Sequence, residues 1–182
     1  MNIQHSARND DWRTPPHIVA MVKEVLGAID LDPASSEEAN REIGAREILT
    51  KAEDGLAAAW TFKPDHLLAV YLNPPGGKLR NKSLAALFWQ QLMRYWHDGR
   101  IRHAIFAAFS VEQLATCQLD RPGCSMLNFP LCVPRKRVQW VDPLDAGRTA
   151  PSHSSCFVYV PGALDKTRTF VDVFSRIGKC KV

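Results

Sequence analysis

The feature that most constrains the fold is the apolar run His66–Leu72, "HLLAVYL", which ends at Asn73-Pro74-Pro75. A near-continuous apolar run of this length is typical of a central strand of a parallel sheet, which is covered on both faces. The two prolines lack amide donors, so they end the strand. The run predicts a buried strand with Asn73 at its carboxyl end.

The segments around this run alternate between strand and helix patterns. Residues 14–27 have apolar residues at helical spacing after Thr14 and two prolines, and residues 35–45 and 81–98 also favour helices. Short strands are expected near residues 29–33, 47–50 and 103–110, with a helix near 111–118. We expect extended chain over 125–141, a last strand near 154–162 and a closing helix near 165–178. The pattern predicts an α/β, Rossmann-like fold, with a mostly parallel sheet and helices on both faces.

Length and composition favour one domain over residues 1–182, with a polar leader at 1–12. No apolar run reaches the roughly 20 residues of a membrane helix, and the leader lacks the apolar core of a secretory signal. We therefore expect a cytoplasmic protein that does not associate with a membrane. The five cysteines have no C-x-x-C pair and the six histidines have no ligand spacing, so we expect free thiols and no metal.

The chain carries a net charge of +4, and its basic residues gather at two places. Lys78, Arg80 and Lys82 follow the Asn-Pro-Pro turn, and Arg135, Lys136 and Arg137 form a run. Each cluster fits phosphate contacts and solvated surface charge equally well when taken alone.

Asn73-Pro74-Pro75 suits one particular chemistry. The exocyclic amine of an aromatic base is a poor nucleophile because its lone pair is delocalised into the ring. Two acceptors beside it, the Asn73 side chain and the Pro74 carbonyl, would stabilise the charge that develops on nitrogen. Pro74 and Pro75 would hold both acceptors in place. The alternative is a rigid turn that only ends the strand.

Four stretches in order, "DDWRTPPHIV", "IDLDPAS", "TKAEDGLAAAW" and "LNPPGG", resemble the small phage and prophage DNA N6-adenine methyltransferases. These belong to the amino-group methyltransferases, which use S-adenosylmethionine and carry an Asn/Asp-Pro-Pro-aromatic motif. The resemblance covers roughly the first half of the chain, and "FPLCVPRKRVQW" and "FVYVPG" are similar too. The resemblance implies that the protein is located in the cytoplasm of the bacterial host cell.

The resemblance also implies a cofactor site. It places Trp12, Thr14 and Pro15 near the methionine part, and Asp32 and Pro33 near the ammonium end, with Ala34 next in the same loop. Asp30 is the second choice for the ammonium, and Asp54 is expected at the adenine amino group. The alternatives are a hydrophobic anchor for Trp12 and a strand-ending turn for Asp32.

Two departures from the family pattern bear on the site. The loop after the first strand has no glycine, and Gly76 replaces the aromatic residue that stacks on the flipped base. Gly76 could adopt positive φ and let the chain approach DNA closely. Phe109 is our first candidate for the missing ring, followed by Phe129 and Trp89.

Together these features predict methyl transfer from S-adenosylmethionine to the N6 amino group of adenine in DNA. Contacts to DNA are expected from Gly76, Lys78, Arg80, Phe109 and the run Arg135, Lys136 and Arg137. Only residues 114–155 are free to read sequence, so recognition is either relaxed or shared within a homodimer. The rival hypotheses are methylation of an RNA base or a glutamine amide, and a binding module that has lost catalysis.

Overall fold

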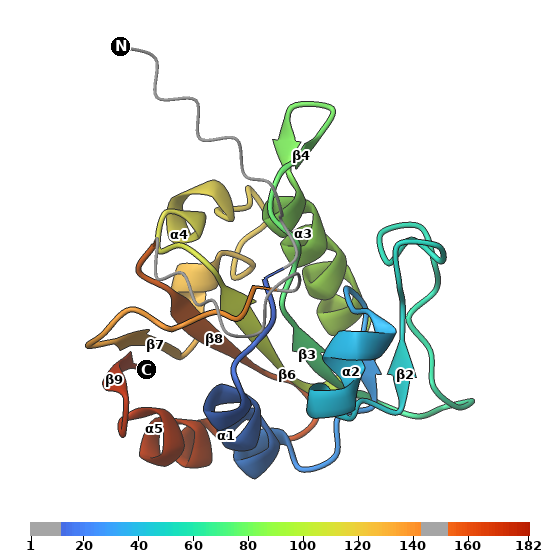
Figure 1. The fold of residues 1–182 in the computed structure, drawn as a ribbon. Coiled ribbons are helices and arrows are strands. Elements are labelled where there is room, and N and C mark those ends of the chain that lie inside the picture. The colour runs from blue at the N-terminus through green and yellow to red at the C-terminus, as the bar shows by residue number, and fades with distance from the viewer. Residues whose placement is uncertain (1–11, 143–152) are drawn as a thin grey trace.

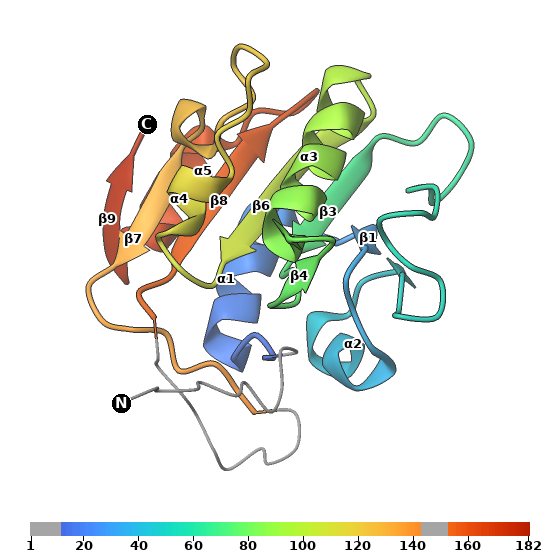
Figure 2. The same ribbon diagram turned by 90° about the horizontal axis from the view of Figure 1, so that it is seen from above.

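The computed structural model describes residues 12–142 and 153–182, and in them a seven-stranded sheet lies between two layers of helices (Figures 1 and 2). The strand order is β2-β1-β3-β6-β8-β7-β9. Strands β2, β1, β3 and β6 pair in parallel, whereas β8, β7 and β9 are joined by antiparallel pairings. Because β7 runs antiparallel to β8, it shares the direction of β6. The α/β class is confirmed, and the sheet is mixed with most strands in one direction.

The central strands are the most apolar. Strand β3 (Leu68–Leu72) is buried at all five positions, and β6 (Ile101–Ala108) is its parallel neighbour. The remaining strands of this sheet are β1 (Leu31–Asp32), β2 (Glu47–Ile48), β7 (Leu131–Pro134), β8 (Cys156–Pro161) and β9 (Gly178–Lys181). A separate hairpin consists of β4 (Lys78–Leu79) and β5 (Lys82–Ser83).

The helices divide between the two faces of the sheet. One face carries α1 (Pro16–Leu26) and α5 (Thr167–Phe174), with α2 (Glu37–Ile43) beside α1. The other face carries α3 (Leu84–His97) and the single turn α4 (Gln113–Thr116), as Figure 2 shows. A 3-10 turn, η1, covers Met126–Asn128. Each face has its own hydrophobic core, so the sheet is buried on both sides as the apolar run predicts.

Local sequence accounts for the helix ends. Ser36 caps α2 by accepting a hydrogen bond from Ala39 N at 3.2 Å, and Gly44 ends this helix with φ 64°. Helix α1 begins at Pro16 with Pro15 as its N-cap, not at Thr14. Thr14 is therefore available for a contact with the sheet.

Two expectations near the C-terminus are wrong. The strand near 154–162 is not the last, and the helix near 165–178 does not close the chain, because β9 follows α5. Strand β9 pairs with β7 in the register Cys132↔Cys180 and leaves Lys179 and Lys181 at the sheet edge. Its four residues are too short and too polar to give a strand signal, and pairing with β7 decides their conformation.

Candidate functional site

Strands β1, β3 and β6 end side by side at one edge of the sheet, which we call the carboxyl edge. Leu31 of β1 pairs with Val70 of β3, and Leu72 pairs with Phe106 of β6. Asp32 is the last residue of β1, and Asn73 and Phe109 directly follow β3 and β6 at this edge. In open α/β sheets, ligands bind beyond the carboxyl ends of the parallel strands.

The side chain of Asn73 has a fixed orientation. Its Nδ2 donates to the carbonyl oxygen of Trp12 at 2.8 Å, which points the amide NH₂ toward the N-terminal segment. Within the described residues, neither Asn73 Oδ1 nor the carbonyl oxygen of Pro74 accepts a hydrogen bond. Pro74 is buried, and Asn73 and Pro75 are half-buried. Two acceptors at the end of β3 thus have no hydrogen-bond donor among the described residues.

The N-terminal segment is joined to β3 by a second hydrogen bond. Thr14 Oγ1 lies 2.6 Å from Tyr71 Oη, and Thr14 is buried together with Pro15. Burial raises the pKa of Tyr71, and the neighbouring Asp32 carboxylate adds to this effect while the bond to Thr14 opposes it. Tyr71 stays a neutral phenol that links Thr14 to the strand. The structure therefore brings Trp12, Thr14 and Pro15 to the carboxyl edge, and Tyr71 is a member of the site that sequence reasoning missed.

Asp32 is the buried acid of this edge, with 1% of its surface exposed. Its Oδ1 accepts a hydrogen bond from Ala34 N at 3.2 Å, and it forms no ion pair with any residue in 12–142 or 153–182. Burial raises the pKa of Asp32 to about 7, although the Ala34 amide partly offsets this effect. A buried carboxylate without a cationic partner is suited to receive a cationic ligand group.

The loop that contains Asp54 packs directly against the Asp32 loop. A Cβ built on Gly55 would lie 1.8 Å from the carbonyl oxygen of Pro33, so only glycine fits at this contact. Asp54 itself is exposed, with φ 55°, and its Oδ1 accepts from Leu56 N at 3.1 Å. Asp54 is thus the neighbour of Gly55, which contacts the Asp32 loop, and the side chain of Asp54 is exposed.

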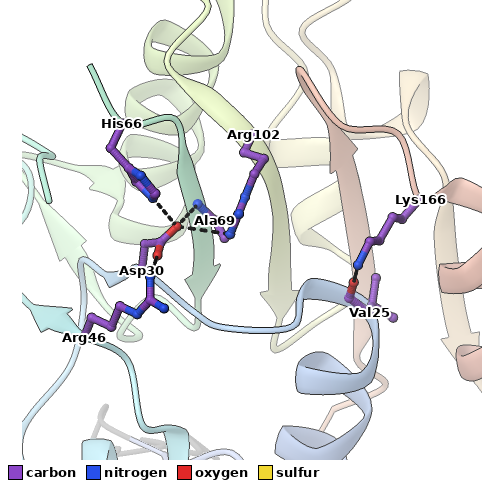
Figure 3. Close-up of polar contacts among 7 residues, drawn as sticks. All are labelled: Val25, Asp30, Arg46, His66, Ala69, Arg102 and Lys166. Atoms are coloured by element: carbon purple, nitrogen blue, oxygen red, sulfur yellow. Dashed lines mark hydrogen bonds and ion pairs between the residues drawn. The ribbon is translucent and has the colours of Figure 1, made fainter. Parts of the chain in front are cut away.

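Asp30 has a different environment from Asp32. Its carboxylate accepts hydrogen bonds from Arg46 at 2.8 Å, from His66 and the Ala69 amide at 2.9 Å each, and from Arg102 at 3.2 Å (Figure 3). Burial alone would raise the pKa of Asp30, but the Ala69 and His66 hydrogen bonds and the Arg102 charge lower it overall. These donors come from the amino ends of β2, β3 and β6. Asp30 is therefore a structural link between strands, and we leave it out of the cofactor site.

A cavity of about 670 Å³ also lies at the amino ends of these strands. Its lining includes Phe62, Lys63, His66 and Arg100, and none of the predicted catalytic residues. It is a broad opening between the Phe62 loop and the sheet, on the side opposite Asn73. We therefore place the candidate site at the carboxyl edge.

Each basic cluster follows a strand that ends at the carboxyl edge. Lys78, Arg80 and Lys82 are exposed on the β4–β5 hairpin, which follows the Asn-Pro-Pro turn. The run Arg135, Lys136 and Arg137 is exposed directly after β7. Because β7 runs in the direction of β6, this run reaches the carboxyl edge, three strand positions or roughly 14 Å from β3.

Gly76 is exposed at the base of the hairpin, but the backbone turns at its neighbour. The expectation of positive φ at Gly76 is wrong, because positive φ, at 89°, occurs at the next residue, Gly77. The positive φ at Gly77, not at Gly76, sets the direction of the chain between Pro75 and β4.

One of the three candidate rings lies at the edge. Phe109 is half-buried at the end of β6, with its ring centroid 5.5 Å from that of Trp140 and 5.4 Å from that of His153. Trp89 and Phe129 are buried, with their ring centroids 5.6 Å apart in the core beneath α3. They cannot stack on a base at the carboxyl edge, which corrects the expectation for them as substitute rings.

The segment 114–155 is not a free recognition insert. Its residues Met126, Leu131, Cys132 and Trp140 are buried in the two cores, and β7 is an inner strand. Turn-forming residues concentrated in 141–155 predict a loop there, most of which, at 143–152, lies outside the described residues. Of this segment, the exposed stretch 135–137 is the part best placed to meet a substrate.

Two further observations concern the described ranges. Across 12–142 and 153–182, no group of three or more His, Cys, Asp or Glu side chains has a geometry that could hold a metal ion. In the same residues, no helix has the length and apolar character needed to cross a membrane.

Comparisons with known proteins give no independent assignment. No family model matches the chain, and searches of curated proteins and of solved structures find no match. What bears on function is therefore the carboxyl edge itself and the order of the sequence motifs.

Proposed function

We propose that the protein is an S-adenosylmethionine-dependent methyltransferase that acts on the N6 amino group of adenine in DNA. The observation that carries the proposal is the fixed orientation of Asn73. Its NH₂ group donates to the Trp12 carbonyl, and its Oδ1, like the carbonyl of the next residue Pro74, accepts no hydrogen bond within the described residues. Such a pair of acceptors binds a group with two N–H donors, as an exocyclic amine is.

The residues around Asn73 fit the cofactor that this chemistry requires. Asp32 would pair with the ammonium group, and Thr14 and Trp12 would line the methionine part. Ala34 and Pro33 would border it through their backbone, and Asp54 would accept from the adenine amino group. When bound, the cofactor supplies a sulfonium methyl group as the electrophile.

In the reaction, Asn73 Oδ1 and the Pro74 carbonyl accept the two N–H groups and favour a lone pair directed at the methyl carbon. The nitrogen–carbon bond forms as the carbon–sulfur bond breaks, in line. The positive charge on nitrogen is stabilised by both acceptors until one proton leaves to water. No ionised base is needed, and the half-buried position of Asn73 strengthens these interactions because water competes less.

DNA is supported as the substrate by charge. The hairpin cations Lys78, Arg80 and Lys82 follow Asn73 closely in the chain, and the run at 135–137 follows β7, three strand positions from β3 along the carboxyl edge. Phosphate contacts of this kind supply most non-specific affinity for DNA. The target base would be rotated out of the helix toward Asn73, and Phe109 would stack on it.

The test is methylation of genomic DNA that lacks N6-methyladenine, incubated with the protein and labelled S-adenosylmethionine and analysed for methylated nucleosides. We expect N6-methyladenine with the wild type. Asn73→Ala should keep less than about a tenth of the rate, a barrier increase above about 1.4 kcal/mol, because the acceptor is lost. It should still bind S-adenosylhomocysteine almost normally in calorimetry.

Three outcomes would contradict the proposal. Full activity of Asn73→Ala would show that Asn73 is not the polarising acceptor. Cofactor binding with label transferred only to RNA or to a glutamine amide would favour the rival enzymes. An absence of cofactor binding would favour the binding module.

A further inference from the structure

The β4–β5 hairpin has features that the methyl-transfer site does not require. It leaves the sheet directly after Pro75 and projects beyond α3, away from the rest of the molecule (Figure 1). Its two-residue turn has positive φ at both central residues, 48° at Arg80 and 65° at Asn81. This is the tight turn that matches the twist of an antiparallel pair, so the hairpin is a defined element and not a loose loop.

The hairpin is anchored at its base. Leu84 N, at the start of α3, donates to the carbonyl oxygen of Gly77 at 3.1 Å, and Pro74-Pro75 restrict the other side. Leu79 follows Asn73 by six residues, so the extended chain places them at most roughly 20 Å apart. The hairpin tip therefore lies within roughly 20 Å of the acceptors of Asn73.

The exposed side chains of the hairpin combine one apolar residue with three cations. Leu79 is 49% exposed and pairs with Lys82, so these two share one face of the hairpin. Lys78, Arg80 and Lys82 form no ion pair with any described residue, and the sequence from 66 to 97 contains no acidic residue. The hairpin therefore presents uncompensated positive charge around an exposed leucine.

We propose that this hairpin enters a groove of duplex DNA and that Leu79 is a wedge, filling the space vacated when the target adenine rotates toward Asn73. The inference rests on the proposed function. Apolar wedges inserted between base steps offset the cost of unstacking, while cations on the same element neutralise the adjacent phosphates. One leucine among three cations has too little apolar surface for a stable protein interface, which is why we choose DNA as the occupant.

The wedge predicts a defect that depends on base pairing. Leu79→Ala should lower kcat/KM on native genomic DNA by at least about tenfold, because opening a paired base costs a few kcal/mol that the wedge repays. On heat-denatured DNA the bases are already unpaired, so the variant should stay within about twofold of the wild type. The matched control is Leu127→Ala, a leucine that is 45% exposed on η1. It should leave both substrates unaffected.

Measurements of DNA affinity at several salt concentrations distinguish the role of Leu79 from that of the cations. With a duplex of random sequence, Lys78→Ala should reduce the slope of log affinity against log salt by about one unit, as for a lost phosphate contact. Leu79→Ala should leave that slope unchanged.

Equal losses on native and denatured DNA would overturn the wedge, since Leu79 would then act on the fold or the catalytic site. No loss on either substrate would overturn it as well, as would a wild-type salt slope in Lys78→Ala. If the wild type methylates neither form of DNA, the proposed function fails, and this inference fails with it.

Discussion

Removing the buried carboxylate of Asp32 should raise the stability of the fold and lower the affinity for the cofactor. Asp32→Asn keeps an Oδ1 acceptor for Ala34 N but removes the negative charge. The folded protein shifts the pKa of Asp32 from 3.8 to about 7. At about 1.36 kcal/mol per unit, ionised Asp32 costs the folded state roughly 4 kcal/mol above pH 7.

The direction of the pH dependence follows from proton binding. Between pH 4 and 7 the folded state holds the Asp32 proton more tightly than the unfolded state, so this residue makes stability fall as pH rises. The variant lacks this contribution. We expect Asp32→Asn to be more stable than the wild type by up to about 4 kcal/mol at pH 8, and by almost nothing near pH 4. Urea unfolding at both pH values, followed by circular dichroism, measures the difference.

Cofactor binding should change in the other direction. Because only the ionised carboxylate pairs with an ammonium group, the variant should lose ~1.5–3 kcal/mol of affinity for S-adenosylhomocysteine at pH 8. Wild-type affinity should rise as pH increases through 7, and the affinity of the variant should show no such rise. Unchanged affinity at pH 8, together with the same stability difference at both pH values, would refute the argument. Asp32 would then only shape the turn after β1.

Three further predictions concern other positions. Phe109→Ala should cost ~1–3 kcal/mol in kcat/KM on DNA with little change in cofactor affinity, and equal losses in both would show that the ring does not stack on the base. Gly55→Ala should destabilise the fold by ~1–3 kcal/mol in urea unfolding and weaken S-adenosylhomocysteine binding, because a Cβ meets the Pro33 carbonyl; wild-type values would disprove that contact. Burial lowers the pKa of His103 to about 4, so the free energy of unfolding should fall by roughly 3 kcal/mol as pH drops from 6.5 to 4. His103→Leu should abolish this loss, and a variant whose stability falls with pH as that of the wild type does would contradict it.

Several features could be predicted from sequence because they depend on local patterns. The apolar run at 67–72 indicates a buried strand wherever it occurs, and Ser36 and Gly44 define the ends of α2 by their own side-chain and backbone preferences. Strand-helix alternation then places Asp32 and Asn73 at one edge of a sheet. These inferences need no knowledge of long-range contacts.

Other features required the tertiary structure because they depend on partners far apart in the chain. Asp30 and Asp32 look equivalent in sequence, two residues apart. Arg46 and Arg102 neutralise the first, which also has a hydrogen bond with His66, while the second is buried without a cation among the described residues.

The same distinction applies to Asn73 and the aromatic candidates. The amino-acid sequence shows that an asparagine follows the central strand, with two prolines to fix the turn. The direction of its amide depends on the folded chain, because the Trp12 carbonyl that orients it comes from 61 residues earlier. Likewise, periodicity could not separate Phe109 at the sheet edge from Trp89 in the core, since burial depends on which elements pack together and not on the residue type.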